Sequence, residues 1–109
     1  MITATADLAG RYDAVIAAYP ALADRLTPLR DAHRAHLTAL ASALGQQPPA
    51  ATAQEAPAGG QGGALTSLAA AEKSGRADAV AACLAAPPRL APLLGSIAAA
   101  RASHQEALK

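Results

Sequence analysis

Apolar residues in the first part of the chain recur at helical spacing. They are separated by four, three and four positions, namely Leu8, Tyr12, Val15 and Tyr19. This spacing places their side chains on one face of a helix, so we expect a helix over about residues 5–19. Pro20 should end it, because proline has no backbone N–H to continue the hydrogen-bond ladder.

A second stripe with helical spacing follows this break. Its members are Leu22, Leu26, Leu29, His33, His36, Leu40 and Leu44. Thr27 is a good N-cap residue, and Pro28 after it suits the first helical position. We therefore expect a short turn and then a straight helix from Pro28 to Leu44, with Gly45 as its C-cap.

The last part of the chain has the same organisation. The first stripe there consists of Leu65, Leu68, Glu72, Ala79 and Cys83, and the second of Leu90, Leu94, Ile97, Arg101, His104 and Leu108. These stripes predict a helix over about residues 64–86, a break at Pro87-Pro88, and a final helix that runs to Leu108. With Val80 and Leu84 beside it, Cys83 is expected to be a small buried apolar residue.

A segment without apolar periodicity separates the two parts. Residues 45–63 hold five of the eight glycines and three of the eight prolines, a composition typical of a flexible linker. It divides the chain into a helical hairpin at 1–44 and another at 64–109. We expect the two hairpins to form one domain.

The two hairpins share an internal repeat. Gly10-Arg11-x-Asp13-x-Val15 recurs as Gly75-Arg76-x-Asp78-x-Val80, and Arg25-Leu26-x-Pro28-Leu29 recurs as Arg89-Leu90-x-Pro92-Leu93. Such ordered matches indicate a duplicated helical hairpin. The fold predicted from these patterns is an all-α four-helix bundle, built from two duplicated hairpins that a long crossover linker joins.

Composition and charge narrow the classes of function. There are 34 alanines and 14 leucines but only two aromatic residues, which favours helices with a thin core and excludes a β-sandwich. Nine scattered basic residues against eight acidic ones argue against nucleic acid as a partner, because such binding needs a concentrated basic face. The apolar stretches 79–88 and 90–100 are too short and too interrupted to span a membrane.

Candidate chemistry lies in a few polar residues on the apolar stripes. They are His33, His36, Glu72 and His104. If neighbouring helices are antiparallel, with Leu44 opposite Ala64, then His36, Glu72 and His104 fall in one layer of the bundle. Imidazoles and a carboxylate converging in a core suit zinc or iron.

A purely structural polar layer is the other interpretation of these residues. In it, Glu72 pairs with Arg101 or with a protonated histidine, and hydrogen bonds satisfy the imidazoles. Tyr12 and Tyr19 are interpreted as the largest packing residues of the core rather than as ligands.

The chain resembles the small alanine-rich ferritin-like lipoproteins and secreted proteins of high-GC actinobacteria. The resemblance rests on Leu8 to Tyr19, Pro20-Ala21-Leu22-Ala23, Arg25 to Arg30, His33 to His36, the proline-rich linker and Leu65 to Glu72. It implies an extracytoplasmic or cell-surface location and a lipid anchor or export signal on a removed N-terminus. The chain departs from metal-loaded ferritin-like proteins because it lacks their paired Glu-x-x-His motifs, so we do not expect di-iron oxidase activity.

Together these features predict a non-catalytic extracytoplasmic helical bundle that acts as a binding or structural module. One alternative is a metal-binding protein that uses His33, His36, Glu72 and His104. Another is a self-associating subunit, such as a homodimer, because alanine-rich helix faces allow close approach between chains.

Overall fold

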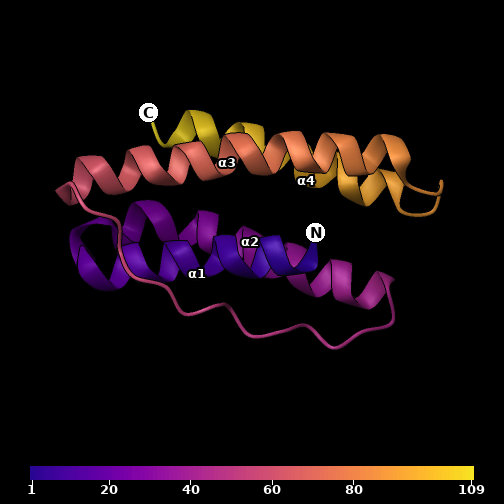
Figure 1. Cartoon of the computed structure of the whole chain (residues 1–109), viewed down its shortest axis with the longest axis horizontal. Helices are drawn as coiled ribbons and strands as arrows, with labels where there is room; N and C mark the ends of the chain where they lie inside the picture. The colour runs from indigo at the N-terminus through magenta and orange to yellow at the C-terminus, as the bar shows by residue number, and fades with distance from the viewer.

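Four α-helices and one short 3-10 helix make up the ordered elements of the chain (Figure 1). The computed structural model describes residues 1–109. Its elements are α1 (Ile2–Ala18), η1 (Pro20–Leu22), α2 (Ala23–Ala43), α3 (Gly60–Ala85) and α4 (Ala91–Ala107). The prediction of an all-α four-helix bundle is confirmed. None of the helices has both the length and the hydropathy that crossing a lipid bilayer requires.

The most extensive contacts are those within each predicted hairpin, between α1 and α2 and between α3 and α4. The turn at η1 was expected, but α2 begins at Ala23 rather than at Pro28, and Thr27 is not its cap. Pro28 lies inside the helix and removes only one backbone hydrogen bond there. Burial of Leu22 and Leu26, one turn apart on the same face, holds this stretch helical.

The crossover connection runs along the length of the bundle, so α2 and α3 point in the same direction (Figure 1). At one end, Leu44 and Leu90 line the same apolar cavity. At the other end, Ala64 packs in a cluster with Leu22 and Leu26. The expected placement of Leu44 opposite Ala64 is therefore wrong. Residues 44–59 can reach about 50 Å at roughly 3.3 Å per residue, enough to follow a molecule 42 Å long.

Part of the crossover is attached to α1. The Thr52 N–H donates to the Ala6 carbonyl at 3.3 Å, and the Gln54 side chain donates to the Asp7 carbonyl at 2.9 Å. Gly10 permits this approach, because a Cβ atom there would lie 1.9 Å from the Thr52 carbonyl oxygen. The observed connection is also shorter than the linker predicted at residues 45–63, because α3 already begins at Gly60.

The apolar core consists of two clusters, one toward each end of the bundle. One holds Leu8, Tyr12, Val15, Leu22, Leu26, Ala64, Leu68 and Leu108, and the other holds Leu40, Ala79, Leu94, Ile97 and Ala98. Most of these residues belong to the predicted stripes. Small side chains at many positions leave the larger residues to supply most of the buried apolar area.

The predicted burial around Cys83 is wrong. Val80 is 45% exposed and Leu84 is 84% exposed, while Cys83 is only partly buried and its thiol donates to the Ala91 carbonyl at 3.3 Å. The buried face of this part of α3 passes through Ala79. Val80 and Leu84 lie about 100° around the helix from Ala79 and Cys83 respectively, which directs them to solvent.

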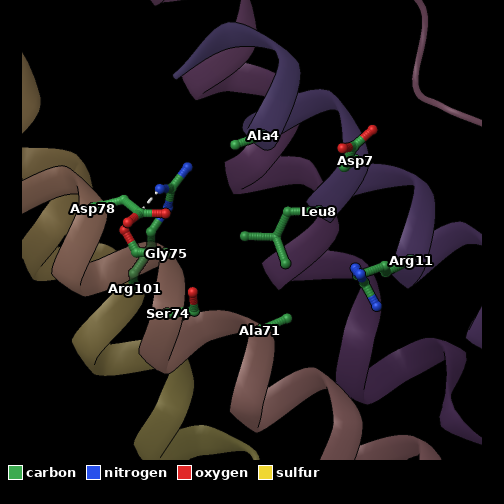
Figure 2. Close-up of a pocket in the computed structure, with 9 residues that line it drawn as sticks. All are labelled: Ala4, Asp7, Leu8, Arg11, Ala71, Ser74, Gly75, Asp78 and Arg101. Atoms are coloured by element: carbon green, nitrogen blue, oxygen red, sulfur yellow. Dashed lines mark hydrogen bonds between the residues drawn. The ribbon is translucent and has the colours of Figure 1, made fainter.

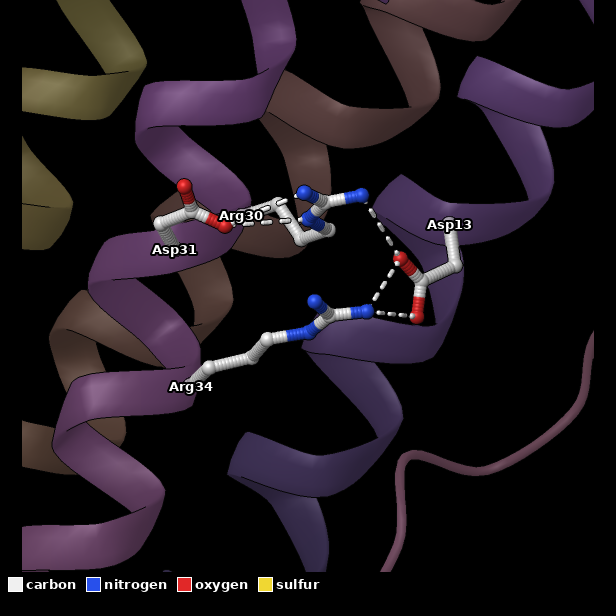
Figure 3. Close-up of polar contacts among 4 residues, drawn as sticks. All are labelled: Asp13, Arg30, Asp31 and Arg34. Carbon is white, nitrogen blue, oxygen red and sulfur yellow. Dashed lines mark hydrogen bonds and ion pairs between the residues drawn. The ribbon is translucent and has the colours of Figure 1, made fainter.

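An ion-pair network joins α1 and α2 on the outside of the first hairpin (Figure 3). Asp13 accepts from Arg34 at 3.0 Å and from Arg30 at 3.5 Å, and Arg30 also contacts Asp31 at 3.1 Å. Pairs as exposed as these contribute little to stability. Because Arg30 and Arg34 of α2 both contact Asp13 of α1, these pairs favour this register of α1 against α2.

We expect Leu68→Ala to lower the free energy of unfolding by about 2–5 kcal/mol, because it leaves a cavity in the core. Leu84→Ala on the same helix is the matched control and should change it by less than about 0.5 kcal/mol. Urea unfolding followed by circular dichroism measures both. Equal losses in the two variants would mean that α3 buries a different face.

Gly10→Ala should detach the crossover from α1, because the new methyl group collides with the Thr52 carbonyl. A glutamyl-specific protease should then cut after the exposed Glu55 faster than in the unsubstituted protein. Gly62→Ala, where an added Cβ meets open space, is the control and should leave the rate unchanged. Identical cleavage of all three proteins would contradict the observed attachment.

Candidate metal centre

One polar side chain from each of the four α-helices meets in the interior of the bundle. These residues are Tyr12 of α1, His33 of α2, Glu72 of α3 and His104 of α4. The first three are fully buried, and the His104 side chain is 12% exposed. Along α3, Glu72 lies between Leu68 of one apolar cluster and Ala79 of the other. The polar group is therefore enclosed by apolar packing on both sides.

Glu72 is the acceptor at the centre of this group. Its Oε1 atom accepts hydrogen bonds from the Tyr12 hydroxyl at 2.6 Å, from His33 Nε2 at 2.5 Å and from His104 Nδ1 at 3.2 Å. With an ionised carboxylate, both histidines must carry a proton on the nitrogen that faces it. Three helices thus donate to one oxygen atom of the fourth.

The protonation states follow from these contacts. Burial by itself would raise the pKa of Glu72, but hydrogen bonds from His104, His33 and Tyr12 and the charge interaction with His33 lower that pKa to about 2. Burial, the charge of Glu72 and the hydrogen bond to it raise the pKa of Tyr12 far above its usual value. Near neutral pH the centre therefore holds an ionised carboxylate beside a neutral phenol.

The two histidines of α2 are held in their neutral form. Burial lowers the pKa of His33, although the hydrogen bond and charge of Glu72 oppose that shift. Burial, followed by the neighbouring His33, Arg101 and His104, lowers the pKa of His36 to about 4. Neutral imidazole is the form that binds metal ions.

Three of these side chains have the separation that a metal ion requires. The ligand atoms of His33, Glu72 and His104 all lie within 4.8 Å of one another. His33 Nε2 is 3.3 Å from His104 Nδ1, which in turn is 3.2 Å from Glu72 Oε1. A tetrahedral ion with bonds of about 2.0–2.1 Å holds its ligand atoms roughly 3.3 Å apart. Two of the three separations match this value.

The third separation is that of a hydrogen bond, because His33 Nε2 and Glu72 Oε1 are only 2.5 Å apart. An ion bound here requires the carboxylate to rotate and the protons on His33 Nε2 and His104 Nδ1 to leave those nitrogens. Two buried atoms without any hydrogen-bond partner, Glu72 Oε2 and His33 Nδ1, are suited to this change. The first can turn toward an ion, and the second can take the proton displaced from His33 Nε2.

His36 lies beside this group but outside the set of converging ligand atoms. Its ring meets the edge of the His33 ring with centroids 5.9 Å apart, and His33 takes the place beside Glu72 that was expected for His36. The reason is the parallel direction of α2 and α3. A layer counted from Leu44 opposite Ala64 selects His36, whereas the observed topology selects His33, one turn away.

Two other interior polar residues, Arg101 and Tyr12, have partners that the sequence did not specify. Arg101 does not pair with Glu72; it donates to the Gly75 carbonyl and to the Thr5 hydroxyl instead. Tyr12 packs in the core as predicted, but it also donates to Glu72. A signal for that bond was present in the sequence, because a buried tyrosine hydroxyl usually finds a partner.

Acid should destabilise the protein between about pH 6.5 and pH 4. The unfolded chain takes up a proton on His36 near pH 6.5, whereas the folded protein resists it down to about pH 4. The neutral form therefore stabilises the fold fully above pH 6.5, and this contribution is lost as the pH falls through that window. Melting temperatures measured from pH 7 to pH 4 should decline, and less steeply in His36→Gln. A variant profile as steep as that of the parent would contradict the assignment to His36.

No protein-family model, no curated protein and no solved structure matches this chain. The resemblance to ferritin-like lipoproteins and secreted proteins therefore stays a prediction from the sequence.

Proposed function

We propose that this chain is a non-catalytic metal-binding bundle that holds one zinc or iron(II) ion between His33, Glu72 and His104. The observation that carries this proposal is the convergence of two imidazoles and one carboxylate, from three different helices, within 4.8 Å. Two histidines and a carboxylate are a ligand set for both metals. We do not include His36 among the ligands.

The surroundings of the three ligands support the proposal. The Tyr12 hydroxyl donates to Glu72 at 2.6 Å, and such contacts to a ligating carboxylate orient it and tune its basicity. The unpartnered Glu72 Oε2 and His33 Nδ1 atoms are costly in a purely structural layer, because buried polar groups normally have partners. A bound ion would be a partner for the second oxygen of the carboxylate.

The burial of the centre favours binding over catalysis. A catalytic metal needs an open coordination position that substrate can reach. His33 and Glu72 are fully buried, and none of the three cavities of the structure is lined by a proposed ligand. The ion would instead join α2, α3 and α4 and stabilise the docking of the two hairpins.

Adding zinc or iron(II), the latter without oxygen, should raise the melting temperature, because a ligand of the folded state stabilises it by mass action. The gain in free energy of unfolding is about 2.7 kcal/mol when the free metal is at 100 times its dissociation constant. Differential scanning calorimetry of protein purified without an affinity tag measures the shift. Elemental analysis of the same preparation identifies any ion that it already carries.

The control compares His104, a proposed ligand, with His36, which lies outside the ligand set. His104→Gln should abolish the metal-dependent shift, whereas His36→Gln should keep most of it. If neither metal stabilises the unsubstituted, metal-stripped protein, the centre is a structural polar layer and the proposal fails. Equal loss in both variants would overturn the assignment of the ligands.

A location outside the cytoplasm and self-association remain predictions from the sequence. The first rests on the resemblance alone, and the second on alanine-rich faces. Neither is needed for a metal centre built within one chain.

A further inference from the structure

Arg101 is a buried cation without a carboxylate partner. It is 1% exposed and forms no ion pair. Its terminal nitrogens donate to the Gly75 carbonyl and to the Thr5 hydroxyl, both at 2.9 Å, while Nε has no partner. Buried charges are normally paired; the charges of Glu72 and Asp78 act on this guanidinium, but it has no direct ion-pair partner.

Helix α3 has a glycine, Gly75, at the point where the Arg101 side chain crosses it. A Cβ atom on Gly75 would lie 3.2 Å from Arg101 Cδ and 3.3 Å from its NH1 atom. Glycine inside a helix is less favourable than alanine. At Gly75 it leaves room for the arginine side chain to pass across α3 toward α1.

The side chain reaches a cavity of about 250 Å³ between α1 and α3. Figure 2 shows Arg101 among the lining residues, with Asp7, Leu8 and Arg11 of α1 on one side and Ser74 and Asp78 of α3 on the other. Arg11 and Asp78 are exposed, whereas Asp7 is half-buried. The cavity is open to solvent and contains charges of both signs.

These charges select against ligands that carry one sign only. A simple anion would be attracted by Arg101 and Arg11 but repelled by Asp7 and Asp78, and a simple amine would meet the opposite pattern. A molecule with both charges satisfies both pairs. The volume is below the roughly 300–1,000 Å³ of clefts for drug-sized ligands, so the molecule must be small.

We propose that this cavity binds a small zwitterion of the amino-acid class, with its carboxylate directed to Arg101 and its ammonium group to Asp78 and Asp7. The ligand supplies the direct ion-pair partner that Arg101 lacks, and Asp78 at the rim provides the selection against plain anions. This site is separate from the metal centre, because no proposed metal ligand lines the cavity.

Isothermal titration calorimetry on the full chain tests the proposal with glycine, β-alanine and 4-aminobutyrate, which differ in the spacing of their charges. Acetate and methylammonium carry each charge alone. At least one zwitterion should bind at least tenfold more tightly than either single-charge probe. Absence of binding by all three zwitterions at 50-fold excess over a millimolar dissociation constant, about 50 mM, would overturn the proposal.

Substitutions distinguish a site for a zwitterion from a site for a plain anion. Asp78→Asn should weaken zwitterion binding at least fivefold and leave acetate binding unchanged or stronger, because it removes only the partner of the ammonium group. Asp24→Asn, an exposed carboxylate outside the cavity, is the matched control and should have no effect. Acetate binding as tightly as the zwitterions, with no effect of Asp78→Asn, would make this an anion site and contradict the proposal.

His104→Gln distinguishes a failure here from a failure of the metal proposal. It removes a proposed metal ligand but leaves every charged group of the cavity in place. Zwitterion binding should therefore persist in this variant. Its loss in a variant that circular dichroism shows to be folded would overturn the independence of the two sites.

Discussion

Glu72 carries its negative charge where water does not reach it, and the arrangement of the other three helices around it follows from that charge. An isolated buried carboxylate would take up a proton; here Tyr12, His33 and His104 each donate to the same oxygen and hold its pKa at about 2. Each donor belongs to a different helix. The bonds therefore specify how far each helix is shifted along its axis, which an alanine-rich core with few large side chains specifies poorly.

The long crossover determines which residues share that layer. Because residues 44–59 return along the bundle, α2 and α3 run parallel, and His33 faces Glu72 while Leu40 packs with Ala79 one layer further along. A short connection would have made α2 and α3 antiparallel and brought His36 to that level. Attachment of the crossover at Gly10, where the absence of a side chain lets Thr52 approach, supports the same path.

The helices could be predicted from the sequence, because apolar spacing, prolines and the repeat all depend on local geometry. The polar residues of the interior could also be named, since His33, His36, Glu72 and His104 lie on apolar stripes. Their grouping could not, because it depends on the direction in which a segment without periodicity returns. The predicted burial of Cys83 beside Val80 and Leu84 was wrong for a related reason. The predicted stripe does pass through the buried Ala79, but apolar spacing alone does not record that Val80 and Leu84, each one position further along, face solvent.

The layer that contains Glu72 is shared equally between the two halves of the chain. The first hairpin supplies Tyr12 and His33, and the second supplies Glu72 and His104. Neither hairpin can assemble the centre alone, because the bonds from Tyr12 and His33 to Glu72 form only on docking, whereas the contact of His104 with Glu72 lies within the second hairpin. The tether makes this docking an intramolecular event with an effective concentration set by its length. Each half therefore needs the other to complete the layer around Glu72, and the crossover supplies that partner within the same chain.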